Sequence, residues 1–299
     1  MIKVVKQLKY FLQNDEKTIK QYFVKLLKSK GYKNIINTND YLFAAGEDPI
    51  ALTAHLDTVF YLLPKEIYYD QEQRVMWSPD GLGADDRLGI WLIHKVLIDN
   101  YKPTIILTTD EEKGNLGAMQ LVTDIKTLPV DIKYIIGLDR RGKNDAVFYQ
   151  CANAEFEEYI TSFGFQTAQG SFSDISTLCP IWQIAGVNLS VGYYNEHSYE
   201  ELIKFDETEE TFDRLKKLLD QSRQAPHFEY IDIYSCICNR CKKQLGELPI
   251  KDKNNKLGIL CIDCLSDLTH IEWCSVCGHA YIPYGKDVKL CKDCIRSTY

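Results

Sequence analysis

The chain has 299 residues, of which 45% are hydrophobic and 26% are charged, a composition typical of soluble globular proteins. No stretch approaches the roughly 20 apolar residues of a membrane-spanning helix, and charges interrupt every apolar run near the N-terminus. These features exclude a membrane-spanning segment, and we expect a cytoplasmic α/β protein of one large domain with a smaller unit, or of two domains.

The formal net charge of −7 is unevenly distributed along the chain. Residues 236–299 contain ten Lys/Arg and seven Asp/Glu, a balance of +3, which leaves −10 for residues 1–235. If two zinc ions were each held there by four thiolates, the balance of the C-terminal part would itself become negative. The charge therefore gives no support for a nucleic-acid surface, although it leaves open a local patch of Arg240, Lys242 and Lys243.

The apolar pattern predicts alternating helices and strands. The first 30 residues have the spacing of two helices, the second of which ends at Gly31. Further helical patterns cover residues 86–99 and 209–219. Four short apolar runs are typical of buried strands, at residues 50–54, 104–109, 134–138 and 187–191. This alternation predicts an α/β fold with a mostly parallel sheet and helices on both faces.

Five side chains that can bind metal lie at or just beyond the ends of apolar runs. They are His55 in Ala-His-Leu-Asp, Asp85 in Gly-Ala-Asp-Asp, Glu112 in Asp-Glu-Glu, Asp139 in Gly-Leu-Asp-Arg and His197 in Asn-Glu-His. Active sites of open α/β sheets form outside the carboxyl ends of the strands. We therefore expect folding to bring these five side chains to one edge of the sheet.

The five side chains match the ligands that two zinc ions need. Ions about 3.5–4 Å apart share an anionic ligand, and each takes further carboxylate and imidazole ligands while keeping a position for water. Asp85 is predicted to bridge the ions, with His55 and Asp139 on one ion and Glu112 and His197 on the other.

Two more acidic residues are predicted to assist the metal site. Glu111 is adjacent to the ligand Glu112, and we expect it to act as the general base that takes a proton from the attacking water. Asp57 follows His55 by two residues and is expected to orient its imidazole, as carboxylates commonly do for ligating histidines.

The ordered motifs resemble those of the co-catalytic di-zinc exopeptidases, a group that includes bacterial leucyl aminopeptidase, peptidase T and glutamate carboxypeptidase. The resemblance covers about residues 1–225 and rests on Ala-His-Leu-Asp-Thr-Val (54–59), Leu-Gly-Ala-Asp-Asp-Arg-Leu-Gly (82–89), Thr-Asp-Glu-Glu-Lys-Gly (109–114), Leu-Asp (138–139) and His197. It implies the same ligand and base assignments, a zinc aminopeptidase-like fold and a cis peptide between Asp85 and Asp86.

The resemblance also indicates a branch within this group. Peptidase T and its relatives carry an additional domain between the fourth and fifth ligands, whereas only 57 residues separate Asp139 from His197 here. This spacing favours the single-domain aminopeptidases, whose Ser-Asp element resembles Ser173-Asp174. Arg140 and Arg141 depart from this expectation, because they can bind a substrate carboxylate. The alternative is that they neutralise nearby acids.

Several other residues are interpreted as structural. His94 lies within a predicted helix, and Tyr193 and Tyr194 are assigned to the core, with a substrate pocket as the alternative. The isolated Cys151 and Cys179 are interpreted as small buried residues.

The C-terminal part, from residue 231, is predicted to be a separate zinc-binding module that follows a hydrolase domain of residues 1–230. Its first residues, 231–237, have the pattern of a strand. Paired Cys-x-x-Cys motifs at these spacings resemble a double zinc ribbon, in which metal binding would supply the folding energy. The eight predicted thiolate ligands of two structural zinc ions are Cys238, Cys241, Cys261, Cys264, Cys274, Cys277, Cys291 and Cys294.

Together these features predict a zinc-dependent exopeptidase. The leading hypothesis is an aminopeptidase that cleaves a peptide bond through a metal-bound hydroxide, with Glu111 as base and two catalytic zinc ions or other divalent metals. A carboxypeptidase or an N-acyl amidohydrolase on the same metals is the nearest alternative. A third hypothesis is a non-catalytic binding protein that recruits a protein partner through its zinc tail.

Overall fold

A computed structural model describes residues 2–149 and 153–231, together with four short strands nearer the C-terminus. The contacts divide the chain into two compact units, Met1–Ile231 and Asp232–Tyr299. In the second unit the described strands form one sheet in the order β14-β13-β16-β15. Their bounds are β13 (Leu248–Lys251), β14 (Leu257–Leu260), β15 (Glu272–Trp273) and β16 (Ala280–Tyr281).

The first unit is built on an eight-stranded sheet in the order β1-β2-β6-β3-β7-β10-β8-β9. The four central strands, β6, β3, β7 and β10, are parallel, whereas β1, β2 and β8 pair antiparallel. The strand bounds are β1 (Ile35–Asn37), β2 (Tyr41–Ala44), β3 (Ala51–His55), β6 (Thr104–Thr108), β7 (Ile135–Arg140), β8 (Asp145–Val147), β9 (Gln166–Ala168) and β10 (Gly186–Ser190). The predicted fold class and all four predicted strands are therefore confirmed.

Seven helices are described in the first unit. Their bounds are α1 (Ile2–Leu12), α2 (Glu16–Ser29), α3 (Ala84–Ile98), α4 (Leu116–Asp124), α5 (Ala154–Thr161), α6 (Asp174–Trp182) and α7 (Phe205–Gln221). The four predicted helices correspond to α1, α2, α3 and α7, although α7 begins earlier than the pattern indicated. Gly31 follows α2 with a φ of 86°, a conformation that suits glycine at a helix end.

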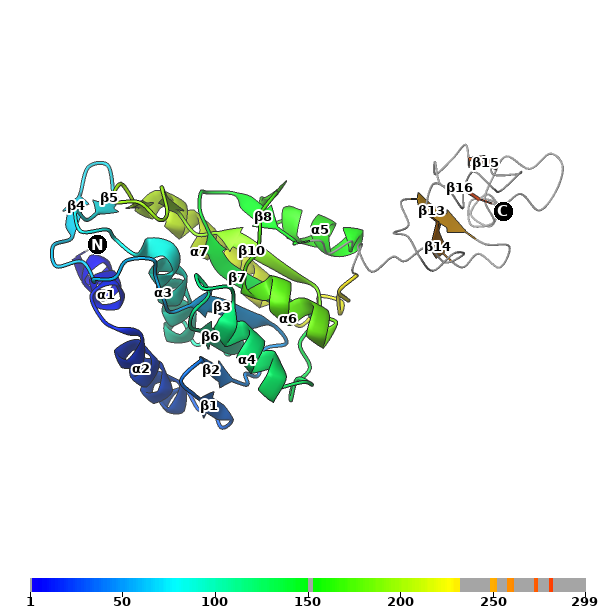
Figure 1. Cartoon of the computed structure of the whole chain (residues 1–299), viewed down its shortest axis with the longest axis horizontal. Coiled ribbons are helices and arrows are strands. Elements are labelled where there is room, and N and C mark those ends of the chain that lie inside the picture. Colours follow the sequence, from blue (N-terminus) through cyan, green and yellow to red (C-terminus); the bar gives the residue numbers. More distant parts are fainter. Residues whose placement is uncertain are drawn as a thin grey trace. The chain divides into compact units, whose positions relative to one another are not determined.

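Helices cover both faces of the sheet. Successive side chains of a strand point to opposite faces, and in the central strands the side chains on both faces are buried. In β2, Leu42 and Ala44 join the core packed under α1, α2, α3 and α7. Tyr41 and Phe43, from the same strand, join a smaller core packed under α4 and α6. Figure 1 shows this layered arrangement around the central strands.

A small antiparallel sheet in the order β11-β12-β5-β4 completes the first unit. Its strands are β4 (Tyr68–Asp70), β5 (Val75–Trp77), β11 (Tyr193–Tyr194) and β12 (Leu202–Lys204). Of the described helices, none combines the length and apolar character needed to cross a membrane. A strand was also predicted at residues 231–237, and all of it after Ile231 lies outside the described residues.

Three of the residues interpreted as structural are buried in the core. The exposed fractions of His94 and Cys179 are each 3%, and that of Tyr193 is 2%. Tyr193 nevertheless has a polar contact, since its hydroxyl donates to Asp139 Oδ1 at 3.3 Å. Tyr194 is partly buried and donates to Glu207. Cys151 lies outside the described residues.

Candidate metal centre

The parallel pairing of the central strands brings several predicted ligands to one edge of the sheet. Strand β3 pairs in parallel with β6 on one side and β7 on the other, so that their carboxyl ends are adjacent. His55 is the last residue of β3, Asp139 lies near the end of β7, and Glu111 and Glu112 follow β6. Asp85 lies in the first turn of α3.

The carboxylate of Asp85 lies between two imidazoles. Its Oδ1 is 3.1 Å from Nε2 of His55, and its Oδ2 is 3.2 Å from Nε2 of His197. A second carboxylate approaches each imidazole. Asp139 Oδ1 is 3.4 Å from His55 Nε2, and Glu112 Oε1 is 2.8 Å from His197 Nε2. All five predicted ligands thus lie in one cluster. It consists of a group around His55 and a group around His197, and Asp85 belongs to both.

The donor atoms fit a pair of divalent ions. The ligand atoms of Asp85, Glu112 and His197 lie within 4.8 Å of one another, and oxygens of Asp85 and Asp139 lie 3.1 and 3.4 Å from His55 Nε2. Imidazole nitrogen and carboxylate oxygen are donors that zinc commonly takes in proteins. A carboxylate whose two oxygens face different imidazoles can also serve two ions at once.

Asp86 belongs to the framework of this cluster. Its Oδ2 accepts from the backbone N–H of His55 at 3.2 Å, and its Oδ1 accepts from that of Gly89 at 3.1 Å. Both oxygens are therefore already occupied by backbone donors. The peptide between Asp85 and Asp86 is cis, as the resemblance implied.

The cluster concentrates acidic groups in a buried place. Burial raises the pKa of Asp139, and the charge of Asp85 adds to this effect. Burial likewise raises the pKa of Glu111. The hydrogen bond to Asp85, reinforced by the charge of Glu112, raises the pKa of His197 to about 9. Burial and crowding therefore raise the pKa of Asp139 and Glu111, an electrostatic penalty that positive ions would relieve.

Asp57 connects the His55 side chain to the loop that follows β6. Its Oδ1 is 3.3 Å from Nδ1 of His55 and accepts from the backbone N–H of Glu111 at 3.1 Å. Its Oδ2 accepts from the backbone N–H of Glu112, also at 3.1 Å. One carboxylate therefore lies beside the imidazole and holds the backbone of the two consecutive glutamates.

Glu201 is a buried residue of the site that sequence reasoning missed. Its exposed fraction is 0%, and its carboxylate accepts from the backbone N–H groups of Gly83 at 2.6 Å and Asp85 at 3.0 Å. Burial raises its pKa to about 7. Glu201 therefore holds the turn that carries Asp85. A single sequence contains no signal for this role, because the contact spans 116 positions.

Asp174 lies beneath the end of β6. It begins α6, it is buried, and its carboxylate accepts a hydrogen bond from the Thr108 hydroxyl. Burial raises its pKa to about 6. The Ser173-Asp174 element is thus connected to the strand from which Glu111 and Glu112 continue.

Each of the two arginines after Asp139 is engaged by a neighbouring acid. Arg140 Nη2 is 3.4 Å from Asp145 Oδ2 and donates to the Gln169 carbonyl at 3.1 Å. Arg141 pairs with Glu196. The arginines therefore have partners near the site without a substrate.

The eight paired cysteines lie outside the described residues.

Comparisons with known proteins identify the fold. No protein-family model matches the sequence, and no curated protein matches it. Among solved structures, aminopeptidase PepT from Bacillus cereus ATCC 10987 has a TM-score of 0.59 at 15% identity, covering 74% of this chain and 98% of its own. A tripeptidase from Staphylococcus aureus has the same TM-score and coverages at 12% identity.

An archaeal structure gives the same result. The aminopeptidase APDkam598 from Desulfurococcus kamchatkensis has a TM-score of 0.54 at 13% identity, covering 73% of this chain and 95% of its own. The first unit of the chain therefore has the mixed α/β fold found in these peptidases.

Proposed function

We propose that the unit Met1–Ile231 is a zinc-dependent aminopeptidase that hydrolyses peptides. The position of Asp85 is the observation that carries this proposal, because its two carboxylate oxygens face the imidazoles of His55 and His197 separately. Such a shared carboxylate is the arrangement that two adjacent catalytic ions require. The fold shared with aminopeptidases is consistent with this chemistry.

Two groups of ligands follow from the distances. His55, Asp85 and Asp139 would hold one ion, and Asp85, Glu112 and His197 would hold the other. When bound, such ions polarise the scissile carbonyl and make water a better nucleophile.

Glu111 is proposed as the general base. A carboxylate oxygen of Glu111 lies within 4.8 Å of possible ligand atoms of His55 and Glu112. Glu111 is not needed as a ligand, because His55 already lies beside Asp85 and Asp139. Burial raises the pKa of Glu111, which suits a carboxyl that must take a proton from water and return it to the leaving amine. Asp57 assists by fixing the backbone of Glu111.

The charges around the site favour a substrate with a free N-terminus. Acidic side chains outnumber basic ones at the cluster, so an ammonium group is attracted to it. Arg140 and Arg141 are the groups that would favour a terminal carboxylate, and both already pair with acids, Asp145 and Glu196. Competition from these acids weakens their attraction for a substrate carboxylate.

The test compares one peptide in three forms on the zinc-loaded protein: free, N-acetylated and C-amidated. We expect the free and C-amidated peptides to be cleaved at similar rates, and the N-acetylated peptide to be resistant. Cleavage that survives acetylation but is lost on amidation would identify a carboxypeptidase instead. Lack of cleavage of all three would contradict the peptidase proposal.

We propose separately that the C-terminal cysteines hold two structural zinc ions. The support is the Cys-x-x-Cys spacing in the sequence. Elemental analysis of the whole chain should find four zinc ions, and Cys238→Ser with Cys241→Ser should remove one without reducing peptide hydrolysis. An unchanged zinc content in this double variant would refute the proposed ligands.

A further inference from the structure

Four of the five proposed ligands have their backbone N–H groups held by buried side chains. Three of these groups donate to carboxylates: His55 to Asp86 at 3.2 Å, Glu112 to Asp57 at 3.1 Å and Asp85 to Glu201 at 3.0 Å. The fourth partner is of a different kind. The N–H of Asp139 donates to the side-chain amide of Asn188 at 2.9 Å, and Asn188 is itself buried.

The Asn188 amide holds both backbone groups of Asp139. Its Oδ1 accepts from the Asp139 N–H, and its Nδ2 donates to the Asp139 carbonyl, both at 2.9 Å. Nδ2 also donates to the Tyr149 hydroxyl at 3.2 Å, so both of its hydrogens are used. An asparagine amide carries the same N–H and C=O groups as a peptide. Asn188 therefore bonds to Asp139 as the backbone of a neighbouring strand would.

The pairing of β7 with β10 is irregular at the point where this clamp acts. Asn188 lies opposite Gly137 and Ser190 opposite Arg140, so two steps along β10 correspond to three along β7. The extra residue of β7 falls in the interval that contains Asp139, and a bulge of this kind interrupts the regular ladder. Gly137 leaves room for the amide, since a Cβ there would lie 3.0 Å from Asn188 Oδ1.

The clamp fixes the residue whose carboxylate faces the metal centre. Asp139 Oδ1 is 3.4 Å from His55 Nε2 and accepts from the Tyr193 hydroxyl at 3.3 Å. An aspartate side chain is short, so the position of its backbone largely determines where its oxygens lie. A neutral amide suits this place, because burial and the charge of Asp85 already raise the pKa of Asp139, and a further carboxylate would add to the crowding.

We propose that Asn188 is a positioning residue for the ion held by His55, Asp85 and Asp139. Its amide fixes the backbone of Asp139 so that the carboxylate faces His55 before the ion binds. Asn188 acts through Asp139 and is not itself a ligand. This role rests on the proposed metal centre. Loss of a group that orients a metal ligand typically lowers metal affinity about 10–100-fold.

The test measures zinc binding by the full-length protein with Asn188→Ala. The imidazole ¹⁵N resonances of His55 and His197, followed in NMR spectra during a titration with buffered zinc, report each half of the centre separately from the cysteines. We expect the zinc concentration for half-occupancy at His55 to rise about 10–100-fold, and that at His197 to rise less. An unchanged value at His55, or equal rises at the two histidines, would overturn the proposal.

A double-mutant cycle separates positioning from packing. In Asp139→Ala the carboxylate that Asn188 orients is absent. Adding Asn188→Ala to that variant should therefore change the zinc affinity at His55 by less than about twofold. If the second substitution lowered the affinity as much as it does in the presence of Asp139, Asn188 would act through the fold and the proposal would be wrong.

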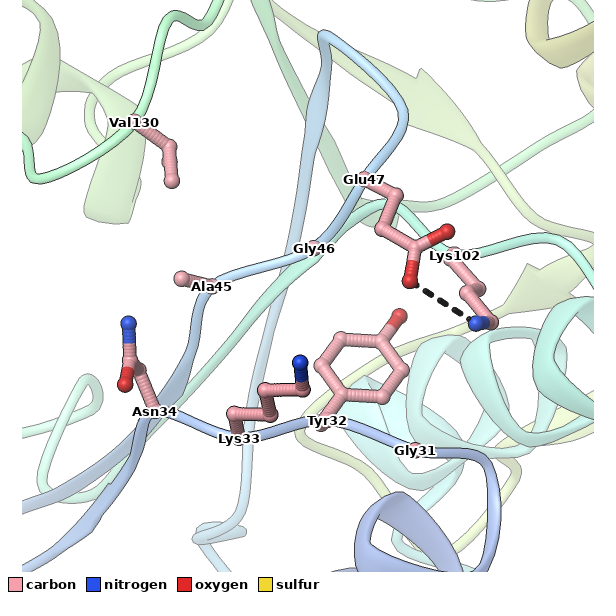
Figure 2. Close-up of a pocket in the computed structure, with 9 residues that line it drawn as sticks. All are labelled: Gly31, Tyr32, Lys33, Asn34, Ala45, Gly46, Glu47, Lys102 and Val130. Carbon is pink, nitrogen blue, oxygen red and sulfur yellow. Dashed lines mark hydrogen bonds and ion pairs between the residues drawn. The ribbon is translucent and has the colours of Figure 1, made fainter.

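Two control variants remove comparable bonds to the backbone. The Ser190 hydroxyl donates to the Arg141 carbonyl at 2.7 Å and accepts from the Asp145 N–H at 3.0 Å. Tyr32 lines the pocket in Figure 2, before the amino end of β6, and its hydroxyl donates to the Pro103 carbonyl at 2.6 Å. Ser190→Ala and Tyr32→Phe should each lower the melting temperature and leave the zinc affinity within about twofold. A loss of zinc affinity in either control as large as in the test variant would contradict the proposed role.

Hydrogen exchange in the metal-free protein tests the clamp without zinc. The Asp139 amide should exchange faster in Asn188→Ala than in the unaltered protein, because its acceptor is gone. Asn188→Ser is a second variant with a smaller change in volume, and it should show the same two effects because its side chain is too short to hold both backbone groups.

The outcomes distinguish this role from the metal centre itself. If the unaltered protein bound no zinc at His55, the metal centre and the role of Asn188 would both be wrong. If exchange at Asp139 became faster in both Asn188 variants while the zinc affinity at His55 stayed the same, only the role of Asn188 would be wrong.

Discussion

The two histidines of the candidate metal centre lie in different surroundings. His55 ends a central strand and is 1% exposed, with Asp57 beside its Nδ1 and Asp86 on its backbone. The side chain of His197 is 49% exposed, and the residue lies between β11 and β12 with a φ of 60°. One half of the centre is thus built into the core, whereas the other half depends on a surface segment.

This difference has a consequence for metal binding. The ligands of the His55 half are held by the sheet before an ion arrives, and preorganised ligands lose less conformational entropy on binding. The His197 half must order a more exposed side chain. We therefore expect the ion on the His55 half to bind more tightly, with Asp85 coupling the two halves.

The largest effect should follow from removing the shared carboxylate. Asp85→Ala takes one ligand from each half, so we expect both catalytic ions and all measurable hydrolysis to be lost. Elemental analysis after dialysis, together with a peptide-cleavage assay, measures both consequences. Retention of two catalytic ions by this variant would show that Asp85 is not a bridge.

Removing the proposed base should leave both halves intact. Glu111→Gln keeps the shape of the side chain but cannot take a proton, so kcat should fall about 10²–10⁴-fold while both ions remain. Glu112→Gln is the matched comparison, because it should lose the ion on the His197 half. If Glu111→Gln retained near-normal kcat, the roles assigned to these adjacent residues would be wrong.

The two histidines can be compared directly by deletion in the metal-free protein. His55→Ala removes one partner from each of the buried carboxylates of Asp57 and Asp85, which should lower the free energy of unfolding by about 1–3 kcal/mol. His197→Ala changes a half-exposed side chain and should cost less. Denaturant unfolding measures both, and equal losses would remove the distinction between the two halves.

Metal removal should also change how stability depends on pH. The pKa of His197 is raised from 6.5 to about 9, so its contribution to stability is complete below pH 6.5 and is lost as the pH rises towards 9. The pKa of Glu201 is raised from 4.5 to about 7, and its contribution is lost between those values. The melting temperature of the chelated protein should therefore fall between pH 6.5 and 9, the interval in which His197 loses its proton.

The zinc-loaded protein provides the control for this pH effect. Its ligands must be deprotonated to bind, so zinc should raise the melting temperature more at pH 8 than at pH 6. If the melting temperature of the chelated protein rose between pH 6.5 and 9, the assigned pKa shift of His197 would be wrong.

The central strands and the ligands after them could be predicted from the sequence for one physical reason. Parallel strands buried on both faces are continuous apolar runs, as at Thr104–Thr108, and functional residues follow their carboxyl ends. The edge strands were missed because they are short and partly exposed, such as Ile35–Asn37. Tertiary pairing, rather than a local apolar pattern, determines these strands.

The supporting contacts of the site could not be predicted from the sequence, because they join residues that are far apart in the chain. Glu201 binds the backbone of Asp85, and Arg141 pairs with Glu196, across 116 and 55 positions. Such contacts depend on the folded topology, and no local pattern encodes them.

The central claim is that two ions share Asp85, and anomalous X-ray scattering at the zinc edge from crystals of the zinc-loaded protein tests it most directly. We predict two peaks about 3.5–4 Å apart, one among His55, Asp85 and Asp139 and the other among Asp85, Glu112 and His197. A single peak, or none within reach of Asp85, would contradict the account.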